Sequence, residues 1–127
     1  MNYLIDTHVL IWHIEGNKNL SKKIISIIEN PQAKIFVSNA SLWEIAIKAS
    51  IGKLSLSLPI TKFKNFLLEN NFTLLEYDFA DLEELITLPF HHSDPFDRMM
   101  IAQAIVKRLS VISDDEKFKQ YPIKLVY

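Results

Sequence analysis

YLIDTHVLIWHIEG, residues 3–16, reads as a short buried strand that turns directly into a helix. Tyr3–Ile5 is a continuous apolar run, and from Thr7 onward the apolar side chains recur at helical spacing until Gly16, where a helix would end. Asp6 stands at the corner between the two elements. A strand that passes straight into a helix is typical of a parallel α/β sheet, so this segment indicates the fold class.

The alternation of apolar strands and amphipathic helices continues along the rest of the chain. The strands expected after the first are Lys34–Val37, Thr73–Tyr77, Leu109–Ile112 and a short edge strand at Lys124–Tyr127. The expected helices are Leu20–Asn30, about Ser38 to Gly52, one opened by Pro59, one from Asp78 to just before Pro89, and one begun by Asp94-Pro95. We therefore predict a three-layer α/β/α fold with a mainly parallel sheet of four to five strands and helices on both faces.

Length and composition predict a single domain over residues 1–127. The chain has 127 residues, of which 49% are hydrophobic, and this is enough for one core and short for two. It contains no cysteine, so disulfides, thiolate zinc sites and cysteine nucleophiles are excluded. A bound metal would have to be held by oxygen or imidazole ligands.

The N-terminal sequence and the net charge bear on location and partners. Asp6 stands where a signal peptide would need a long apolar stretch, and no apolar run approaches the roughly 20 residues of a membrane span, so we expect a soluble cytoplasmic protein with no membrane partner. The net charge of −1 gives no overall attraction to a polyanion, so local cations would have to bind nucleic acid. The candidates, most of which are also compatible with solvated helix faces, are Lys22-Lys23, Lys48, Lys53, Arg98 and Lys107-Arg108.

Acidic side chains gather at the strand ends of the predicted sheet, the edge where ligands of open parallel sheets bind. They are Asp6 after the first strand, Glu44 in the helix after the second, Asp94 and Asp97 at the start of the helix before the fourth, and Asp114 and Asp115, with Ser113, after the fourth. Carboxylates brought together repel one another unless protons or a cation compensate, and hard Mg²⁺ or Mn²⁺ suits an all-oxygen site. Such an ion can orient a phosphodiester, activate a water and neutralise developing charge.

Each of these residues also has a structural interpretation that the sequence leaves open. Capping or turn roles are open to Asp6, Asp94, Ser113 and Asp115. Ser41-Leu42-Trp43-Glu44 fits a capping box, and Glu44 can pair with Lys48 at i,i+4 spacing. Asp97 shares a helical stripe with Ile101 and Ala104, which predicts that its carboxylate leans toward the sheet.

The histidines and aromatic residues are assigned to packing. No histidine pair has metal-ligand spacing beside a third ligand, so packing or turn roles are expected for His8, His13, His91 and His92. Aromatic residues at helix-face spacing are expected in the core or in a dimer interface and not as platforms that stack bases; they are Trp12, Trp43, Phe63, Phe66, Phe72 and Phe79.

Several stretches stand in a distinctive order along the chain: YLIDTH at residues 3–8, VSNASLWEI at 37–45, HSDPFDR at 92–98 with IAQA at 101–104, and VISDDEKF at 111–118. The acid after the first strand and the Trp-Glu-Ile segment are weak signals alone, whereas Asp-Pro-Phe-Asp-Arg followed by Ile-Ala-Gln-Ala is much more specific. In this order they resemble the PIN domain family, in its VapC-like branch. The resemblance spans nearly the whole chain and implies a PIN-like fold.

The resemblance also implies roles for individual residues. The implied acidic pocket and metal ligands are Asp6, Glu44, Asp97 and Asp115. Asp6 and Asp97 are the expected direct ligands, and the other two acids would act partly through water. Ser113 stands where the family usually has threonine and keeps the hydroxyl. Asp94 has a supporting role and also fits a helix cap. Thr7 and Arg98 would contact phosphate or orient carboxylates. The alternative for Thr7 is a hydroxyl at the start of a helix, and the alternative for Arg98 is an exposed ion pair.

The function implied by the resemblance is a Mg²⁺-dependent endoribonuclease, with Mn²⁺ as a substitute, that acts as a homodimeric toxin silenced by a VapB-like antitoxin. An idle PIN-type module that binds nucleic acid or protein is the main alternative, and retention of all the implied acids argues against it. A phosphoacceptor domain would need paired acids after the first strand and a lysine near the last. A DNA nuclease stays open because metal-assisted cleavage does not itself select ribose.

Overall fold

Strands and helices alternate from one end of the chain to the other, and the computed structural model describes all 127 residues. The strands are β1 (Asn2–Ile5), β2 (Lys34–Ser38), β3 (Phe72–Leu75), β4 (Ser110–Ile112) and β5 (Leu125–Val126). The helices are α1 (Thr7–Glu15), α2 (Lys22–Glu29), α3 (Asn39–Ser50), α4 (Phe63–Glu69), α5 (Phe79–Ile86) and α6 (Pro95–Lys107), with 3₁₀ turns η1 (Ile60–Lys62) and η2 (Glu116–Gln120).

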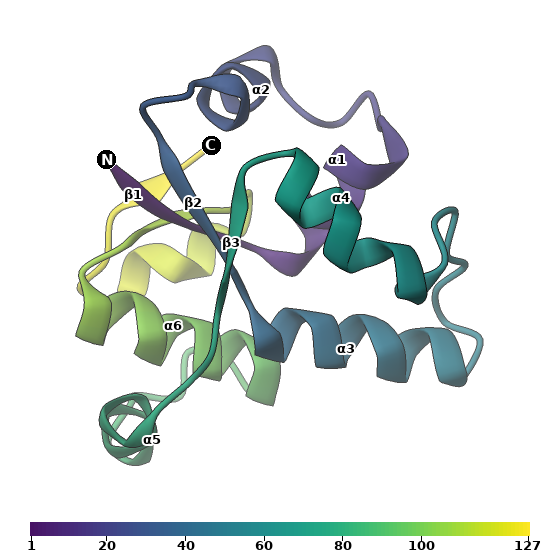
Figure 1. Cartoon of the computed structure of the whole chain (residues 1–127). Helices are drawn as coiled ribbons and strands as arrows, with labels where there is room; N and C mark the ends of the chain where they lie inside the picture. The colour runs from purple at the N-terminus through teal and green to yellow at the C-terminus, as the bar shows by residue number, and fades with distance from the viewer.

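The five strands form one sheet in which every neighbouring pair is parallel (Figure 1). Their order is β3-β2-β1-β4-β5, so the first strand of the chain lies at the centre of the sheet. From β1 the chain moves to β2 on one side and returns later to β4 on the other side. This reversal creates a crevice beyond the carboxyl ends of β1 and β4, the place where open α/β sheets bind ligands.

Helices cover both faces of the sheet because alternate strand residues point to opposite sides. Tyr3 and Ile5 are buried against α1, α2 and α4, while Leu4 is buried against α6, η2 and the end of α5. Figure 1 shows α1, α2 and α4 above the sheet and α5 and α6 below it. The predicted three-layer α/β/α arrangement with a parallel sheet is thereby confirmed. No helix combines the length and the hydrophobicity that a membrane-spanning segment requires.

The expected capping box at the start of α3 is wrong. The N-cap is Ser38, whose hydroxyl accepts a hydrogen bond from the Ala40 amide at 3.1 Å, and Ser41 lies inside the helix, fully buried. The chain does form a capping box at α5, where Asp78 and Asp81 each accept a hydrogen bond from the other's backbone amide. The error arises because both serines satisfy the local pattern, and only strand β2 decides where the helix can begin.

Other element ends also differ from the sequence expectation. The helix expected over Leu20–Asn30 begins only at Lys22, because Ser21 caps it by accepting from the Ile24 amide at 3.2 Å. The helix expected from Pro59 starts as η1 before α4, and the third strand lies earlier than Thr73–Tyr77. η2 was not expected at all. The short Ser113–Asp115 turn that precedes it positions two candidate site residues.

Candidate active site

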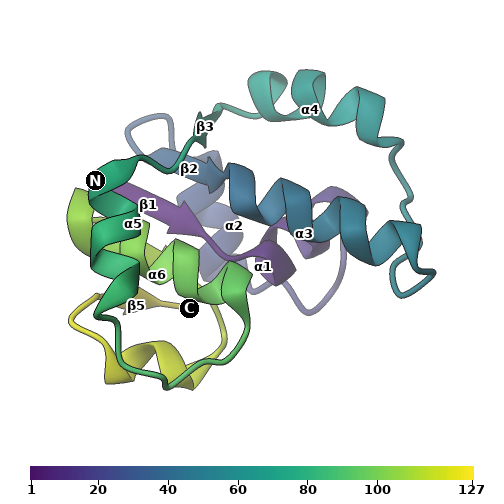
Figure 2. The same ribbon diagram turned by 90° about the horizontal axis from the view of Figure 1, so that it is seen from below.

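The candidate site lies at the carboxyl edge of the sheet, between the ends of β1 and β4. Asp6 directly follows β1, Ser113 directly follows β4, and α3 leaves the end of β2. Figure 2 shows the first turns of α1, α3 and α6 converging at this edge. Helix N-termini carry partial positive charge, which is favourable beside carboxylates. The topology therefore brings acids from distant parts of the sequence to one place.

Asp6 is held by the strand at the other side of the crevice. Its side chain is buried, and its Oδ2 accepts a hydrogen bond from the Ser113 hydroxyl at 2.7 Å, while its amide donates to the Ile112 carbonyl at 2.9 Å. Burial raises the pKa of Asp6, and the Ser113 hydrogen bond and the nearby His8 ring only partly offset that increase. Although Asp6 precedes α1, its side chain makes no capping hydrogen bond, so it remains free to face the crevice.

Glu44 reaches the crevice from the second turn of α3 and is almost completely buried. Its Oε2 pairs with Lys48 Nζ at 2.6 Å, which confirms the expected i,i+4 pair. This hydrogen bond raises the pKa of Lys48 despite partial burial of the ammonium group. The second carboxylate oxygen, Oε1, is buried without any hydrogen-bond partner. Burying a carboxylate oxygen without a partner lowers the stability of the fold. A bound cation would supply the partner that Oε1 lacks.

Asp94 and Asp97 enter the site from the start of α6. Asp94 is the N-cap, and its Oδ1 accepts from the amides of Phe96 and Asp97 at 2.8 and 3.1 Å. Asp97 is half-buried, and its pKa is raised to about 7 by burial first and then by repulsion from Asp94, Asp6, Glu44 and Asp115. A carboxyl group with this pKa is only partly ionised at neutral pH, which means that the site has excess negative charge.

Asp115 is fixed by a buried histidine. Its Oδ2 lies 2.8 Å from His92 Nε2, and its Oδ1 accepts from the Lys117 amide at 3.0 Å. Burial alone would raise the pKa of Asp115, but these hydrogen bonds and the imidazole charge outweigh it and lower the pKa. His92 Nδ1 lies 3.2 Å from the Tyr121 hydroxyl, so the ring is held at both nitrogens. His92 thus acts as a positioning residue for Asp115.

We expect His92→Phe to raise the pKa of Asp115 toward its ordinary value and to lower the free energy of unfolding by about 1–3 kcal/mol. Phenylalanine keeps an aromatic ring in this place but lacks the nitrogens that bond Asp115 and Tyr121. Carboxyl ¹³C NMR titration and urea unfolding measure the two effects. His91→Phe is the matched control, since His91 is exposed and its ring also meets the Tyr121 ring, in an edge-on contact. An unchanged Asp115 titration would contradict the positioning role.

The acids line one open pocket of about 410 Å³ that contains no hydrophobic residue. Its lining is Asp6, Thr7, His8, Glu44, Lys48, Asp94, Asp97, Asp114 and Asp115. The structure therefore brings together every implied acid of the site, together with Asp94 and Thr7. Ser113 lies behind the lining and acts through Asp6, since it is fully buried. The catalytic roles of these residues stay predictions.

Thr7 and Arg98 occupy different positions relative to the pocket. Thr7 donates from its buried hydroxyl to Ser41 Oγ at 2.8 Å, which ties α1 to α3. Arg98 does not line the pocket. Its guanidinium is buried, donates to the carbonyls of Leu88 and Pro89 at 3.0 and 2.9 Å, and stacks on Phe90 with 3.8 Å between Cζ and the ring centroid. In the structure Arg98 supports the loop before α6, and it makes no exposed ion pair.

We expect Arg98→Lys to lower the free energy of unfolding by about 2 kcal/mol, because a lysine cannot reproduce the forked hydrogen bonds to two carbonyls. Urea unfolding followed by circular dichroism measures the change. Arg108→Lys serves as the control, because Arg108 is exposed at the end of α6. Equal unfolding midpoints for both variants would contradict a structural role for Arg98.

The site fits a hard divalent cation by its chemistry, although its side chains do not form a ready-made cluster. Its donors are carboxylate oxygens, they repel one another, and Glu44 Oε1 is buried and unpaired. No three acidic or histidine side chains, as placed, form a group that could hold an ion together. In each of Asp6, Glu44 and Asp115, a neighbouring side chain already holds one carboxylate oxygen, through Ser113, Lys48 and His92 respectively.

Sequence reasoning missed two contributors to this site and underestimated a third. His92 was assigned to packing, yet it holds Asp115, and His8 was assigned likewise, yet it lines the pocket. Asp114 was noted without a role and also lines the pocket. A signal for His92 was present, since it stands two residues before the Asp94 cap in the most specific motif. The contact itself depends on the fold, because its partner is 23 residues away.

Comparisons with known proteins agree on the fold. A family scan matches residues 3–124 to the PIN domain. The structure matches a chain of VapBC2 from Rickettsia felis bound to a DNA fragment from their promoter, with a TM-score of 0.73, 16% identity and coverage of 99% of this chain and 98% of that chain. It also matches a chain of DNA-bound VapBC from Salmonella typhimurium, with a TM-score of 0.67, 15% identity and coverage of 99% and 97%.

A toxin–antitoxin complex from Klebsiella pneumoniae contains a third similar chain, with a TM-score of 0.66, 19% identity and coverage of 98% of this chain and 96% of that chain. No curated protein matches the sequence. At these identities the structural likeness concerns the fold, while the family follows from the match over nearly the whole sequence. With its central parallel sheet and its acidic pocket at the carboxyl edge, the chain belongs to the PIN domain family.

Proposed function

We propose that this protein is a Mg²⁺-dependent endoribonuclease and the toxin component of a VapBC-like toxin–antitoxin module. The observation that carries the proposal is the pocket lined by Asp6, Glu44, Asp97 and Asp115, in which burial, followed by repulsion from the neighbouring carboxylates, raises the pKa of Asp97 to about 7. A divalent ion relieves this repulsion, and Mn²⁺ satisfies the same donors. Membership of the PIN family supports a nuclease, and the similar VapBC chains support the toxin role.

The residues of the chain divide the catalytic work by position. Asp6 and Asp97 would be the direct metal ligands, with Glu44 and Asp115 completing the shell in part through water. When bound, the metal supplies charge neutralisation and an activated water for phosphodiester hydrolysis. Ser113 keeps Asp6 in place through a 2.7 Å hydrogen bond. Lys48 lies at the border of the pocket, where its ammonium group can also meet a phosphate.

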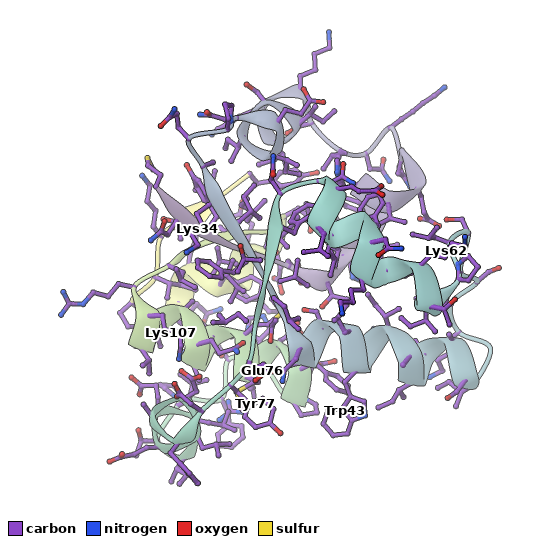
Figure 3. All side chains as sticks on the ribbon, in the orientation of Figure 1. Lys34, Trp43, Lys62, Glu76, Tyr77 and Lys107 are labelled. Carbon is purple, nitrogen blue, oxygen red and sulfur yellow. The ribbon has the colours of Figure 1, made fainter.

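The proposed partners are an RNA substrate, a second copy of the chain and a VapB-like antitoxin. The similar chains come from complexes described as VapBC or as a toxin–antitoxin pair, which supports an antitoxin. Exposed apolar side chains on α3 and α5, including Trp43 and Phe79, which are 61% and 89% exposed, support a homodimer. Figure 3 shows Trp43 projecting from α3 on the side away from the sheet. Neither residue belongs to the core, so of the two places that the sequence allows for them, the core and a dimer interface, only the dimer interface stays open.

The test of this function is cleavage of total cellular RNA by the purified protein. Matched single-stranded and duplex DNA are incubated in parallel, each with Mg²⁺, with Mn²⁺ and with excess EDTA. Cleavage of RNA that needs either metal and stops in EDTA is the expected result. Cleavage of DNA alone would convert the proposal to a DNA nuclease. The absence of metal-dependent cleavage of either nucleic acid would favour an idle binding module.

A further inference from the structure

A second pocket continues from the acidic one along the groove between α1 and α3. It encloses about 440 Å³ and shares Thr7, His8 and Lys48 with the acidic pocket. Its other lining residues are Ile11, Trp12, Glu15, Lys53 and Leu54. Pockets of roughly 300–1,000 Å³ are typical of small-molecule and cofactor sites. Figure 2 shows α1 and α3 side by side, and the three shared lining residues make the two pockets immediate neighbours.

The wall of this second pocket has the composition of a site for an unpaired base. Trp12 is only half-buried, and its ring meets the His8 ring edge-on, with centroids 6.1 Å apart. Ile11 and Leu54 complete an apolar surface around it. An accessible indole in an apolar pocket offers a stacking surface that any base can use. Trp12 packs against the core, as the sequence predicts, and its half-buried ring also lines this pocket.

Two lysines, Lys48 and Lys53, line the second pocket and can bind the phosphates of a nucleic acid. The side chain of Lys53 is exposed, and the backbone that carries it is fixed because the amides of Lys53 and Leu54 both donate to the Lys48 carbonyl, at 2.9 and 3.2 Å. Gly52, with φ of 74°, provides the left-handed turn that this geometry requires. The adjacent acidic pocket repels phosphate. The ammonium groups of Lys53 and Lys48, at the border of that pocket, attract phosphate.

We propose that the pocket lined by Trp12 and Lys53 is a substrate subsite that holds one unpaired nucleotide next to the cleaved bond, with the base stacked on Trp12 and a phosphate on Lys53. The proposal rests on the proposed function, since it assigns the substrate class as single-stranded nucleic acid. A duplex cannot stack on Trp12 without unpairing a base. The subsite therefore predicts that cleavage falls in loops and single-stranded segments.

The test is binding of a short fluorescein-labelled 2′-O-methyl RNA in low salt with excess EDTA, which removes the metal that cleavage requires. Fluorescence anisotropy gives the affinity of the wild type and of Trp12→Leu, Lys53→Ala and Lys23→Ala. Leucine preserves apolar bulk where Trp12 contacts the core, and Lys53→Ala changes an exposed residue, so neither variant should unfold the protein. Lys23 is exposed on α2, lines neither pocket and is the matched control.

We expect Trp12→Leu to weaken binding by about 5- to 100-fold, in line with the loss of one base stack. Lys53→Ala should weaken it less and reduce the slope of log K against log salt by about 0.7, as for one phosphate contact on a single strand. Lys23→Ala should bind like the wild type. In a Trp43→Phe background, in which Trp12 is the only tryptophan, the RNA should also quench the tryptophan fluorescence.

Equal binding by the wild type, Trp12→Leu and Lys53→Ala overturns the subsite. If the RNA does not bind saturably, the subsite is overturned too, and a protein segment becomes the better occupant of the apolar wall. Because the RNA is uncleaved and the metal is chelated, this result is separate from the chemistry in the acidic pocket. If binding depends on Trp12 but the protein cleaves no RNA, only the proposed function is overturned. If the protein cleaves RNA with metal but both variants bind like the wild type, only the subsite is overturned.

Discussion

Asp6→Asn and Asp97→Asn are each expected to lower the rate of metal-dependent RNA cleavage by at least about 100-fold, the scale seen when a preorganised electrostatic or metal-supporting group is removed. Both substitutions keep side-chain size, and an asparagine at position 6 can still accept the Ser113 hydrogen bond. The loss arises because a neutral amide binds a divalent cation far more weakly than a carboxylate. Initial rates on a defined RNA, in Mg²⁺ and in Mn²⁺, measure it.

The matched control for these variants is Glu83→Gln. Glu83 is an exposed acid on α5 that does not line the acidic pocket, so its loss of charge should leave the rate unchanged. Circular dichroism must confirm that every variant is folded. A folded Asp97→Asn protein that cleaves RNA at the wild-type rate would remove Asp97 from the metal ligands. Activity that survives in both aspartate variants, or in EDTA, would refute the metal-dependent nuclease.

Asp97→Asn is also expected to raise the free energy of unfolding at pH 8 in EDTA by about 1–3 kcal/mol, after allowance for solvent screening of a half-buried group. The pKa of Asp97 rises from 3.8 to about 7 on folding, so between these values the folded state binds more protons than the unfolded chain. Stability of the wild type must therefore fall as the pH rises from about 4 to about 7. Asparagine carries no such penalty.

Urea unfolding at a series of pH values measures this difference. The stabilising effect of Asp97→Asn should be fully present above pH 7 and absent below about pH 4, where the carboxyl group is protonated in both states. Mg²⁺ should raise the melting temperature of the wild type more than that of Asp97→Asn, because a bound ion stabilises the folded state by mass action. If Asp97→Asn is less stable than the wild type at pH 8, the ionised Asp97 carboxylate makes a favourable contact and does not destabilise the folded state.

Local patterns were sufficient for the fold class and for the set of acids. Hydrophobic periodicity separates strands from helices because it depends only on near neighbours, and Asp94-Pro95 marks a helix start through backbone chemistry of its own. Element ends were less predictable. Ser38 and Ser41 both fit an N-cap, and the choice between them depended on where β2 ends. The expected capping box failed for this reason.

The acids could be assigned to one pocket from sequence because the carboxyl ends of parallel strands share an edge, so Asp6 and Asp115 had to lie near each other once the strands were known. Their protonation and their partners could not be assigned. The pKa of Asp97 depends on burial and on four carboxylates, three of which come from distant parts of the chain. The Lys48 pair was foreseeable, because i,i+4 residues on a helix are neighbours wherever the helix lies.

Sequence alone thus determined a parallel α/β fold, its acidic edge and the family resemblance, because each rests on local periodicity or on a contiguous motif. Tertiary structure alone decided that Ser113 holds Asp6 across 107 residues of sequence, that His92 holds Asp115, and that Arg98 is buried beneath a loop. It also decided that Trp12 opens into a pocket beside the acids. The reason is physical: these contacts depend on side-chain direction and on packing between elements, which no local pattern specifies.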